Sequence, residues 1–278
     1  MSRTERTGEH YMETEVKVGI CQWNLPEKGP AGCLAAAAAG LAGVELDYSE
    51  ELPERTEAYI ETGKRKGLAY PTLGMNVFCA RSYTEPGGEA FFLRCVRDAC
   101  RCAEKLGSRI LQIPAFFASG IRDGRALETA AANLRAACVI AGDAGITVGT
   151  ENVLTAEENE RLFALVDRPE LGYYFDTQNM IRMRGQDPRD CLLRMRDKLC
   201  EVHAKDSAEN GSGAVIWAPL GEGSAAYGGT AALLKTIGYR GWILLENDYQ
   251  NARPGYTAAD FAAAAARDMR RIGEDFRI

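Results

Sequence analysis

The chain has 278 residues, of which 46% are hydrophobic and 26% charged, and its 33 basic and 39 acidic side chains give a net charge of −6. These values are typical of a globular protein with a sizeable core, and the mild acidity argues against a nucleic-acid partner, which would need a basic face. No apolar stretch approaches the roughly 20 residues of a membrane span, and the charged start of the chain leads into no secretory signal. The sequence therefore predicts a cytoplasmic protein that has neither nucleic acid nor a membrane as its partner.

Nine cysteines are scattered along the chain. Their number is odd, no pair has Cys-x-x-Cys spacing, and several, such as Cys95, Cys102 and Cys138, fall within apolar helical patterns. We interpret them as the reduced, buried thiols of an intracellular protein, not as disulfides or zinc ligands.

Short runs of β-branched and aromatic residues alternate with longer runs rich in alanine and leucine along the whole chain. The short runs predict strands, and they are nearly continuously apolar, as expected of a parallel sheet that is covered on both faces. In chain order they are Val16–Gln22, Gly43–Tyr48, Thr72–Phe78, Ser108–Pro114, Ile146–Glu151, Gly172–Asp176, Leu199–Lys205 and Trp242–Asn247. The helical patterns between them include Glu89–Leu106, Ala126–Ala144, Ala156–Leu165, Pro188–Lys198 and Gly229–Ile237.

Eight strand–helix units without a linker predict an α/β fold, the (β/α)₈ TIM barrel, as a single catalytic domain over 16–278. Residues 1–15 are predicted to be a polar N-terminal extension. A doubly wound open sheet is the alternative, and a Gly-x-Gly-x-x-Gly turn after the first strand would favour it. The segment Cys21–Pro26, which follows that strand, does not resemble such a turn.

One imidazole and three carboxylates stand at the ends of four successive predicted strands: Glu151, Asp176, His203 and Glu246. His203 is the only histidine in the body of the chain. In a β/α barrel the strand ends converge over the mouth, so the four side chains could hold one divalent ion. Three oxygens and one nitrogen suit Mn²⁺ or Mg²⁺, with Co²⁺ as a further candidate. Individually, Asp176 could instead cap a helix and His203 could be a packing residue.

Two further side chains are candidates for binding a substrate. Lys205 lies two residues beyond His203 and points the same way along the strand, so it could offset the surplus negative charge and hold a substrate oxygen, or else extend to solvent or pair with Asp206. Trp23, just after the first strand, could form an apolar wall against a sugar ring or chain, or simply be part of the core.

The chain resembles the xylose-isomerase-like TIM barrels of the sugar phosphate isomerase/epimerase group over nearly its whole length. The motifs that carry the resemblance are Thr150-Glu151-Asn152, Phe175-Asp176-Thr177-Gln178-Asn179, Val202-His203-Ala204-Lys205-Asp206, Pro219-Leu220-Gly221-Glu222-Gly223 and Leu245-Glu246-Asn247. Each motif is unspecific alone, but their order and their places at strand ends are characteristic of this superfamily.

The resemblance implies a divalent ion held by Glu151, Asp176, His203 and Glu246, with Mn²⁺ as the first candidate. It also implies that Glu151 and Glu246 act as an acid/base pair on a ketose, a ketose phosphate or a related polyol ketone through an enediolate intermediate. The expected activity is that of a metal-dependent sugar isomerase or epimerase. Its partner would be a small sugar or sugar phosphate, and a homo-oligomer is compatible with the sequence.

The chain departs from the family at two places. Asn179 stands where many epimerases have a histidine; it could bind a substrate hydroxyl or carbonyl but could not carry a proton. The arginine that ketose epimerases often present after the strand-seven histidine is absent from Ser207–Trp217. The loop Gly221–Gly223 could bind phosphate or be an ordinary turn. The substrate is therefore left open.

Three other functions differ in the residues that they require. An inosose dehydratase-like lyase would use the same metal site, and a non-catalytic sugar-binding or partner subunit would use none of its chemistry. An endonuclease IV-like DNA repair enzyme is rejected, because it needs many histidines and a basic surface, whereas this chain has two histidines and a net charge of −6.

Overall fold

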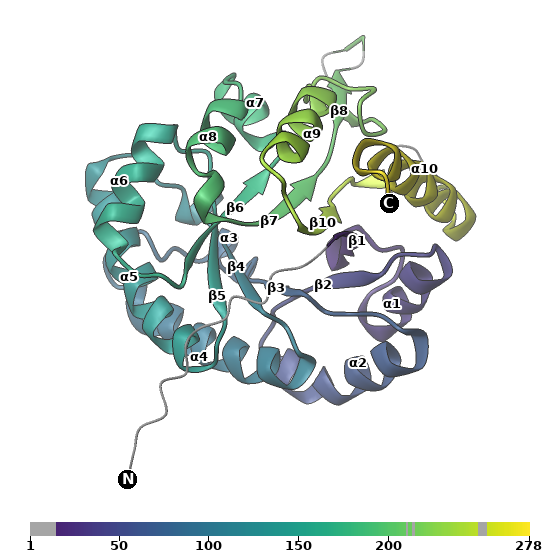
Figure 1. Cartoon of the computed structure of the whole chain (residues 1–278). Helices are drawn as coiled ribbons and strands as arrows, with labels where there is room; N and C mark the ends of the chain where they lie inside the picture. Colours follow the sequence, from purple (N-terminus) through teal and green to yellow (C-terminus); the bar gives the residue numbers. More distant parts are fainter. Residues whose placement is uncertain (1–14, 210, 213–214, 250–254) are drawn as a thin grey trace.

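Eight parallel strands close into a barrel, paired in the order β1, β10, β7, β6, β5, β4, β3 and β2 (Figure 1). The structure is a computed structural model that describes residues 15–209, 211–212, 215–249 and 255–278. The barrel strands are β1 (Val16–Cys21), β2 (Gly43–Asp47), β3 (Thr72–Gly74), β4 (Ile110–Pro114), β5 (Thr147–Glu151), β6 (Leu171–Asp176), β7 (Leu199–Ala204) and β10 (Gly241–Leu245). The predicted N-terminal extension, 1–15, lies outside the described residues except for Glu15, so this domain boundary stays a prediction.

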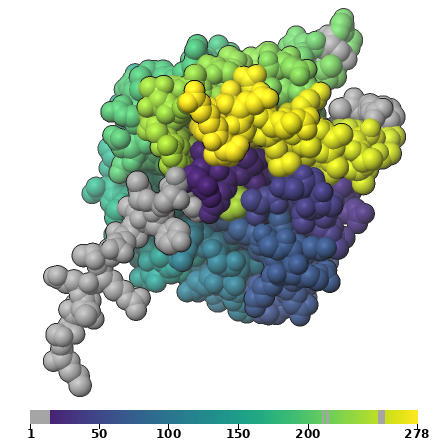
Figure 2. Space-filling view, turned by 45° about the vertical axis from the view of Figure 1, so that its right-hand side comes forward, coloured from purple at the N-terminus to yellow at the C-terminus, as the bar shows by residue number. Residues whose placement is uncertain are grey.

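Helices surround the barrel and connect its strands (Figure 1). They are α1 (Gly29–Ala38), α2 (Leu52–Lys66), α3 (Val77–Ala80), α4 (Glu89–Leu106), α5 (Gly124–Asp143), α6 (Ala156–Val166), α7 (Asn179–Arg184), α8 (Arg189–Arg194), α9 (Tyr227–Thr236) and α10 (Ala258–Phe276), with the short 3₁₀ turns η1 (Gln22–Asn24), η2 (Phe117–Ser119) and η3 (Arg196–Lys198). The predicted single-domain (β/α)₈ barrel is confirmed. In Figure 2 the last helix, α10 (yellow), lies against the first elements of the chain (purple), and it contacts both α1 and β1, which closes the ring.

Helix α4 shows how the sequence produces the outer layer. Its apolar residues recur at helical spacing, and Phe92, Val96 and Ala99 are fully buried, whereas Arg94 and Arg97 on the other side are exposed. Gly107 ends the helix with φ +79°, a conformation that costs glycine little. The helix has the bounds that the apolar pattern predicted.

The third strand is shorter than predicted. We expected a strand over Thr72–Phe78, but β3 ends at Gly74 and α3 begins at Val77. Asn76 already has helical φ and ψ angles, and its backbone N–H donates to Asp47 Oδ1 at 3.3 Å, while Phe78 N donates to Met75 O. The apolar run was thus continuous, but its second half packs as a helical turn at the barrel mouth.

Two more differences concern the loops beyond the last strands. A small antiparallel hairpin, β8 (Ser207–Glu209) with β9 (Val215–Trp217), follows β7 in a segment where we expected no strand. β10 ends at Leu245, so Glu246 and Asn247 follow the strand instead of extending it.

All nine cysteines are free, and seven of them are buried, which agrees with the predicted reduced thiols. Among the described residues, no helix combines the length and the apolar character that crossing a bilayer requires.

Candidate functional site

Glu151, Asp176, His203 and Glu246 come together over the carboxyl ends of four adjacent strands, and we call these four residues the mouth cluster. Each offers one oxygen or nitrogen atom within 4.8 Å of the others. His203 Nδ1 lies 3.5 Å from Glu151 Oε2 and 3.3 Å from Glu246 Oε2. The adjacency of β5, β6, β7 and β10 in the barrel produces this meeting, as the sequence predicted.

The chemistry of the mouth cluster fits a divalent cation. Glu151, Asp176 and His203 are buried and Glu246 is nearly so. His203 Nδ1 has no hydrogen-bond partner, and leaving a buried polar atom unpaired is costly. Three carboxylates around one imidazole nitrogen give the oxygen-rich set that Mn²⁺ and Mg²⁺ accept.

The two carboxylate oxygens of Asp176 have different partners. Its Oδ1 accepts hydrogen bonds from the backbone N–H groups of Gln178, the N-cap of α7, and Asn179, its first residue, so Asp176 holds the start of this helix without being its N-cap residue. Its Oδ2 faces the mouth cluster, 3.1 Å from Lys205 Nζ. Burial raises the pKa of Asp176 to about 6, against the opposing effect of the Lys205 charge, and the negative charge of Glu246 adds to the rise.

Lys205 lies inside the site and does not extend to solvent. It is only 6% exposed, and its Nζ lies 2.5 Å from Glu246 Oε2 as well as 3.1 Å from Asp176 Oδ2. Burial by itself would lower the pKa of Lys205, but the carboxylates of Asp176 and Glu246 raise it above its ordinary range. Burial would likewise raise the pKa of Glu246, and Lys205 and His203 lower it instead. The lysine is therefore charged and offsets part of the negative charge.

Asn179 and Trp23 each hold one of the two glutamates. Asn179 Nδ2 donates to Glu151 Oε1 at 2.8 Å, and Gln112 Nε2 donates to the other oxygen of that carboxylate. Trp23, in η1, donates from Nε1 to Glu246 Oε1 at 3.2 Å. The tryptophan is thus a polar anchor as well as an apolar surface, a contact that its position in the sequence did not reveal.

Sequence reasoning missed Glu45 on β2, which is fully buried inside the barrel. Its Oε2 lies 2.6 Å from His203 Nε2 and accepts hydrogen bonds from the Tyr174 hydroxyl at 3.1 Å and from Cys21 Sγ at 3.4 Å. Burial by itself would lower the pKa of His203, but Cys21, Glu45 and the two glutamates of the mouth cluster raise it well above its ordinary value. The available signal was a charged residue in the middle of an otherwise apolar strand, Gly43-Val44-Glu45-Leu46.

A second carboxylate, Glu201 on β7, is also fully buried inside the barrel. The Thr72 hydroxyl donates to its Oε2, and burial raises the pKa of Glu201 to about 8, with the charge of Glu45 adding to the rise. We call Glu45 and Glu201 the interior pair.

The loop Gly221–Gly223 is a turn and does not present a free anion site. The backbone N–H groups of Gly221 and Gly223 donate to Asp206 Oδ2 at 3.0 and 3.1 Å, and that of Ala225 donates to Oδ1 at 2.9 Å. The chain's own carboxylate occupies these donors, so the phosphate site considered from the sequence is wrong for this loop.

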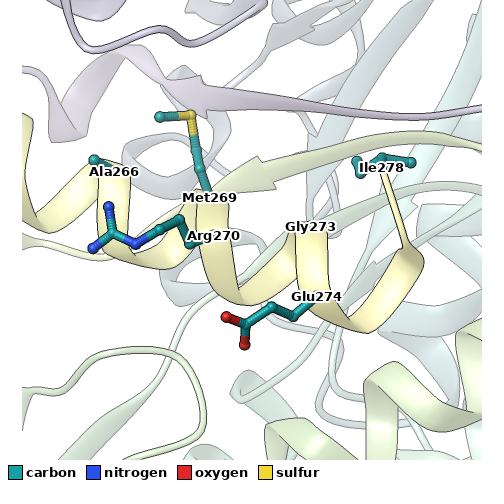
Figure 3. Close-up of a pocket in the computed structure, with 6 residues that line it drawn as sticks. All are labelled: Ala266, Met269, Arg270, Gly273, Glu274 and Ile278. Carbon is teal, nitrogen blue, oxygen red and sulfur yellow. The ribbon is translucent and has the colours of Figure 1, made fainter.

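Two hollows lie outside the mouth cluster. One, of about 360 Å³, is at the mouth beside Asn152, and its lining includes the exposed Phe117 together with Arg122, Met183 and Arg184. The other, of about 560 Å³, lies along the last turns of α10. Figure 3 shows Arg270 and Glu274 on its helix, with Met269 pointing to the opposite side from Glu274. Because helices return antiparallel to the strands, this second hollow is at the end of the barrel away from the mouth.

Comparison with known proteins identifies a family model and a curated relative that each match most of the chain. The family model described as xylose isomerase-like TIM barrel matches residues 33–271. A curated relative, 2-epi-5-epi-valiolone 7-phosphate 2-epimerase from Actinoplanes sp., is 28% identical over 270 residues, which cover 92% of this chain and 97% of that protein.

Solved structures share the fold at lower identity. D-allulose 3-epimerase from Methylomonas sp., in complex with D-allulose, is 19% identical with a TM-score of 0.74, over 95% of this chain and 99% of that one. The IOLI protein with a bound zinc atom is 14% identical with a TM-score of 0.77, over 94% and 99% of the two chains.

Proposed function

The chain belongs to the xylose isomerase-like TIM barrel family, and we propose that it is a sugar epimerase or isomerase that depends on a divalent metal. Its substrate would be a ketose, a ketose phosphate or a related polyol ketone. The epimerase relative that matches over nearly the full length supports this class of reaction. Nine free thiols and the absence of a membrane-crossing helix among the described residues favour a cytoplasmic location as part of the proposal.

The observation that carries the proposal is the pair Glu151 and Glu246. The two carboxylates come from β5 and from the end of β10, and the strands between these two, β6 and β7, bring Asp176 and His203. The two glutamates therefore flank Asp176 and His203 within the cluster, and each has one oxygen within 3.5 Å of His203 Nδ1. Two carboxylates so placed can remove a proton from one face of a carbon and return one to the other.

The mouth cluster would hold the ion. When bound, a divalent cation would stabilise negative charge on the substrate's carbonyl and hydroxyl oxygens, which acidifies the adjacent C–H bond. Mn²⁺ is the ion that we propose, with Mg²⁺ and Co²⁺ as alternatives. A zinc atom in a structural neighbour makes Zn²⁺ a necessary part of any metal screen.

The surrounding side chains would position the acid/base pair and the substrate. Asn179 holds Glu151 and Trp23 holds Glu246 through hydrogen bonds. Lys205 can turn one N–H from Glu246 or Asp176 toward a substrate oxygen, and its charge favours the negative enediolate over the neutral ketone. The hollow beside Asn152 gives room for the part of the substrate that does not react.

Solvent exchange tests the proposal directly. Protein stripped with a chelator and reloaded with Mn²⁺, Mg²⁺, Co²⁺ or Zn²⁺ is incubated in D₂O with free ketoses, ketose phosphates and a phosphorylated cyclitol ketone. Mass spectrometry and NMR of the recovered sugars should show deuterium at a carbon next to the carbonyl. An enone absorbance in the ultraviolet would instead indicate elimination, as in a dehydratase. A metal-loaded protein that exchanges no proton in any of these compounds would contradict the proposal.

A further inference from the structure

On the side that faces the barrel interior, the His203 ring is held by a side chain that lies outside the mouth cluster. Its Nε2 lies 2.6 Å from Glu45 Oε2, and both side chains are fully buried. The ring edge packs on Tyr174, with centroids 4.6 Å apart, and the Tyr174 hydroxyl donates to the same Glu45 oxygen. The two ring nitrogens therefore have different neighbours: Nε2 faces an anion inside the barrel, and Nδ1 faces the mouth cluster.

The surroundings of Glu45 are arranged to keep its carboxylate in place. Cys21 Sγ lies 3.4 Å from Oε2 and 3.4 Å from His203 Nε2. On the other side is Gly74, where an added Cβ would lie 3.0 Å from Glu45 Oε1 and as close to the Trp23 ring. A side chain at position 74 would thus displace Glu45 or Trp23, and glycine leaves room for both.

Cys21, Glu45 and His203 could in principle bind a second metal ion, but the distance between Nε2 and Oε2 argues against it. Two ligands of one tetrahedral ion, each roughly 2.1 Å from it, would stand roughly 3.4 Å apart. At 2.6 Å the two atoms have the separation of a short, charge-assisted hydrogen bond. Glu45 therefore acts on His203 directly.

We propose that Glu45 is a positioning residue for the mouth cluster, which fixes the tautomer and the orientation of the His203 ring. By accepting a hydrogen bond from Nε2–H, it leaves the lone pair on Nδ1, the atom that faces Glu151 and Glu246. In the opposite tautomer Nδ1–H would point at the cluster, and the only nitrogen donor to the ion would be lost. The inference rests on the proposed function, because it assumes that the mouth cluster binds a metal.

Metal affinity is the first test. Glu45→Gln keeps the size of the side chain but removes the charge and lets the amide donate to Nε2, which favours the wrong tautomer. Calorimetric titration of the stripped protein with Mn²⁺ and Zn²⁺ should show affinity about 10- to 100-fold weaker than that of the wild type, the usual loss when the carboxylate behind a histidine ligand is removed. Glu201→Gln is the matched control, because Glu201 is also fully buried in the barrel and bonds Thr72 instead of the imidazole. It should change the affinity by less than about threefold.

The second test determines which nitrogen of His203 carries the proton. If Glu45 only supported the fold, its substitution would not change this tautomer. The chain has two histidines, so a His10→Gln variant labelled with ¹⁵N-histidine has a single imidazole. Long-range ¹H–¹⁵N spectra with diamagnetic Zn²⁺ or Mg²⁺ bound should show a proton on Nε2 and none on Nδ1. In Glu45→Gln the Nε2–H signal should lose its downfield shift or give way to the Nδ1–H form.

The outcomes separate the two proposals. If the wild type binds none of the metals, the proposed function fails and this inference fails with it. If the wild type binds metal and Glu45→Gln binds it equally well, only the role of Glu45 is overturned. If Glu45→Gln does not fold, the wild-type spectrum decides, since a proton on Nδ1 in the loaded protein would contradict the assignment.

Discussion

The mouth cluster and the interior pair are both groups of buried carboxylates, and His203 lies between them, yet their surroundings differ. Each interior carboxylate has one oxygen that accepts a hydrogen bond from the chain, Glu45 Oε2 from Tyr174 and Glu201 Oε2 from Thr72, and one oxygen without a partner. In the mouth cluster, Glu246 accepts from Trp23 and Lys205, while Asp176 Oδ2, which lies 3.1 Å from Lys205 Nζ, and His203 Nδ1 have no hydrogen-bond partner. The difference teaches that burial alone does not mark a ligand site. What marks the mouth cluster is that three carboxylates and one imidazole, from four adjacent strands, each offer an oxygen or nitrogen atom within 4.8 Å of the others.

The largest expected effect of breaking the mouth cluster is on catalysis. Glu151→Gln should lower the exchange rate by about 10²- to 10⁴-fold, the usual contribution of a positioned acid/base group. The fold should survive, because Gln112 Oε1 has no hydrogen-bond partner and could accept from the new amide after a flip of the Gln112 side chain. The measurement is deuterium incorporation under metal saturation, compared with Glu246→Gln.

The control for this variant is Glu61→Gln on the exposed face of α2. It makes the same chemical change far from the mouth and should leave the exchange rate unaltered. Equal rates for wild type and Glu151→Gln would remove Glu151 from the acid/base pair.

Metal binding should stabilise the protein, and the gain should depend on pH. An ion at about 100 times its dissociation constant raises the free energy of unfolding by about 2.7 kcal/mol. The pKa of Asp176 is raised to about 6, and a ligand must be deprotonated to bind, so the affinity falls as the pH drops through about 6. Thermal unfolding with and without Mn²⁺ should show a larger shift near pH 8 than near pH 5. The same shift at both values would speak against these ligands.

Only part of this site could be predicted from the sequence alone. The members of the mouth cluster stand at strand ends, and in a barrel all strand ends meet, so their convergence followed from the element pattern. Glu45 lies in mid-strand, and only the closure of the barrel, through β1 and β10, brings β2 within reach of β7. The indole N–H of Trp23 and the donors around Asp206 depend on rotamers and turns that periodicity does not encode.

At Glu201, losing a donor should cost stability and leave metal binding unchanged. Thr72→Val keeps the shape of the side chain but removes the hydroxyl that donates to Glu201. We expect a loss of about 1–3 kcal/mol in the free energy of unfolding, as for other buried polar groups left without a partner. Urea unfolding measures this loss, and calorimetry should find the Mn²⁺ affinity of the wild type.

Thr236→Val is the comparison for that variant, since the exposed Thr236 hydroxyl bonds only a carbonyl of its own helix. Its effect should be within about 0.5 kcal/mol. If Thr72→Val instead weakened metal binding as strongly as Glu45→Gln, Glu201 as well as Glu45 would act on the mouth cluster, and Glu201 would no longer serve as a control.

A separate effect concerns Asp47, a carboxylate that ends β2 as Asp176 ends β6 but lies outside both regions. Burial raises the pKa of Asp47 to about 7, and the backbone N–H of Asn76 only partly offsets the rise. An acid whose pKa is raised on folding stabilises the fold at low pH, and this contribution is lost as the pH rises through the folded-state value. Asp47→Asn removes the ionisation, so the variant should gain stability relative to the wild type between about pH 5 and pH 8. Urea unfolding at the two pH values measures the gain, and a constant difference would show that Asp47 ionises as freely in the folded chain as in the unfolded one.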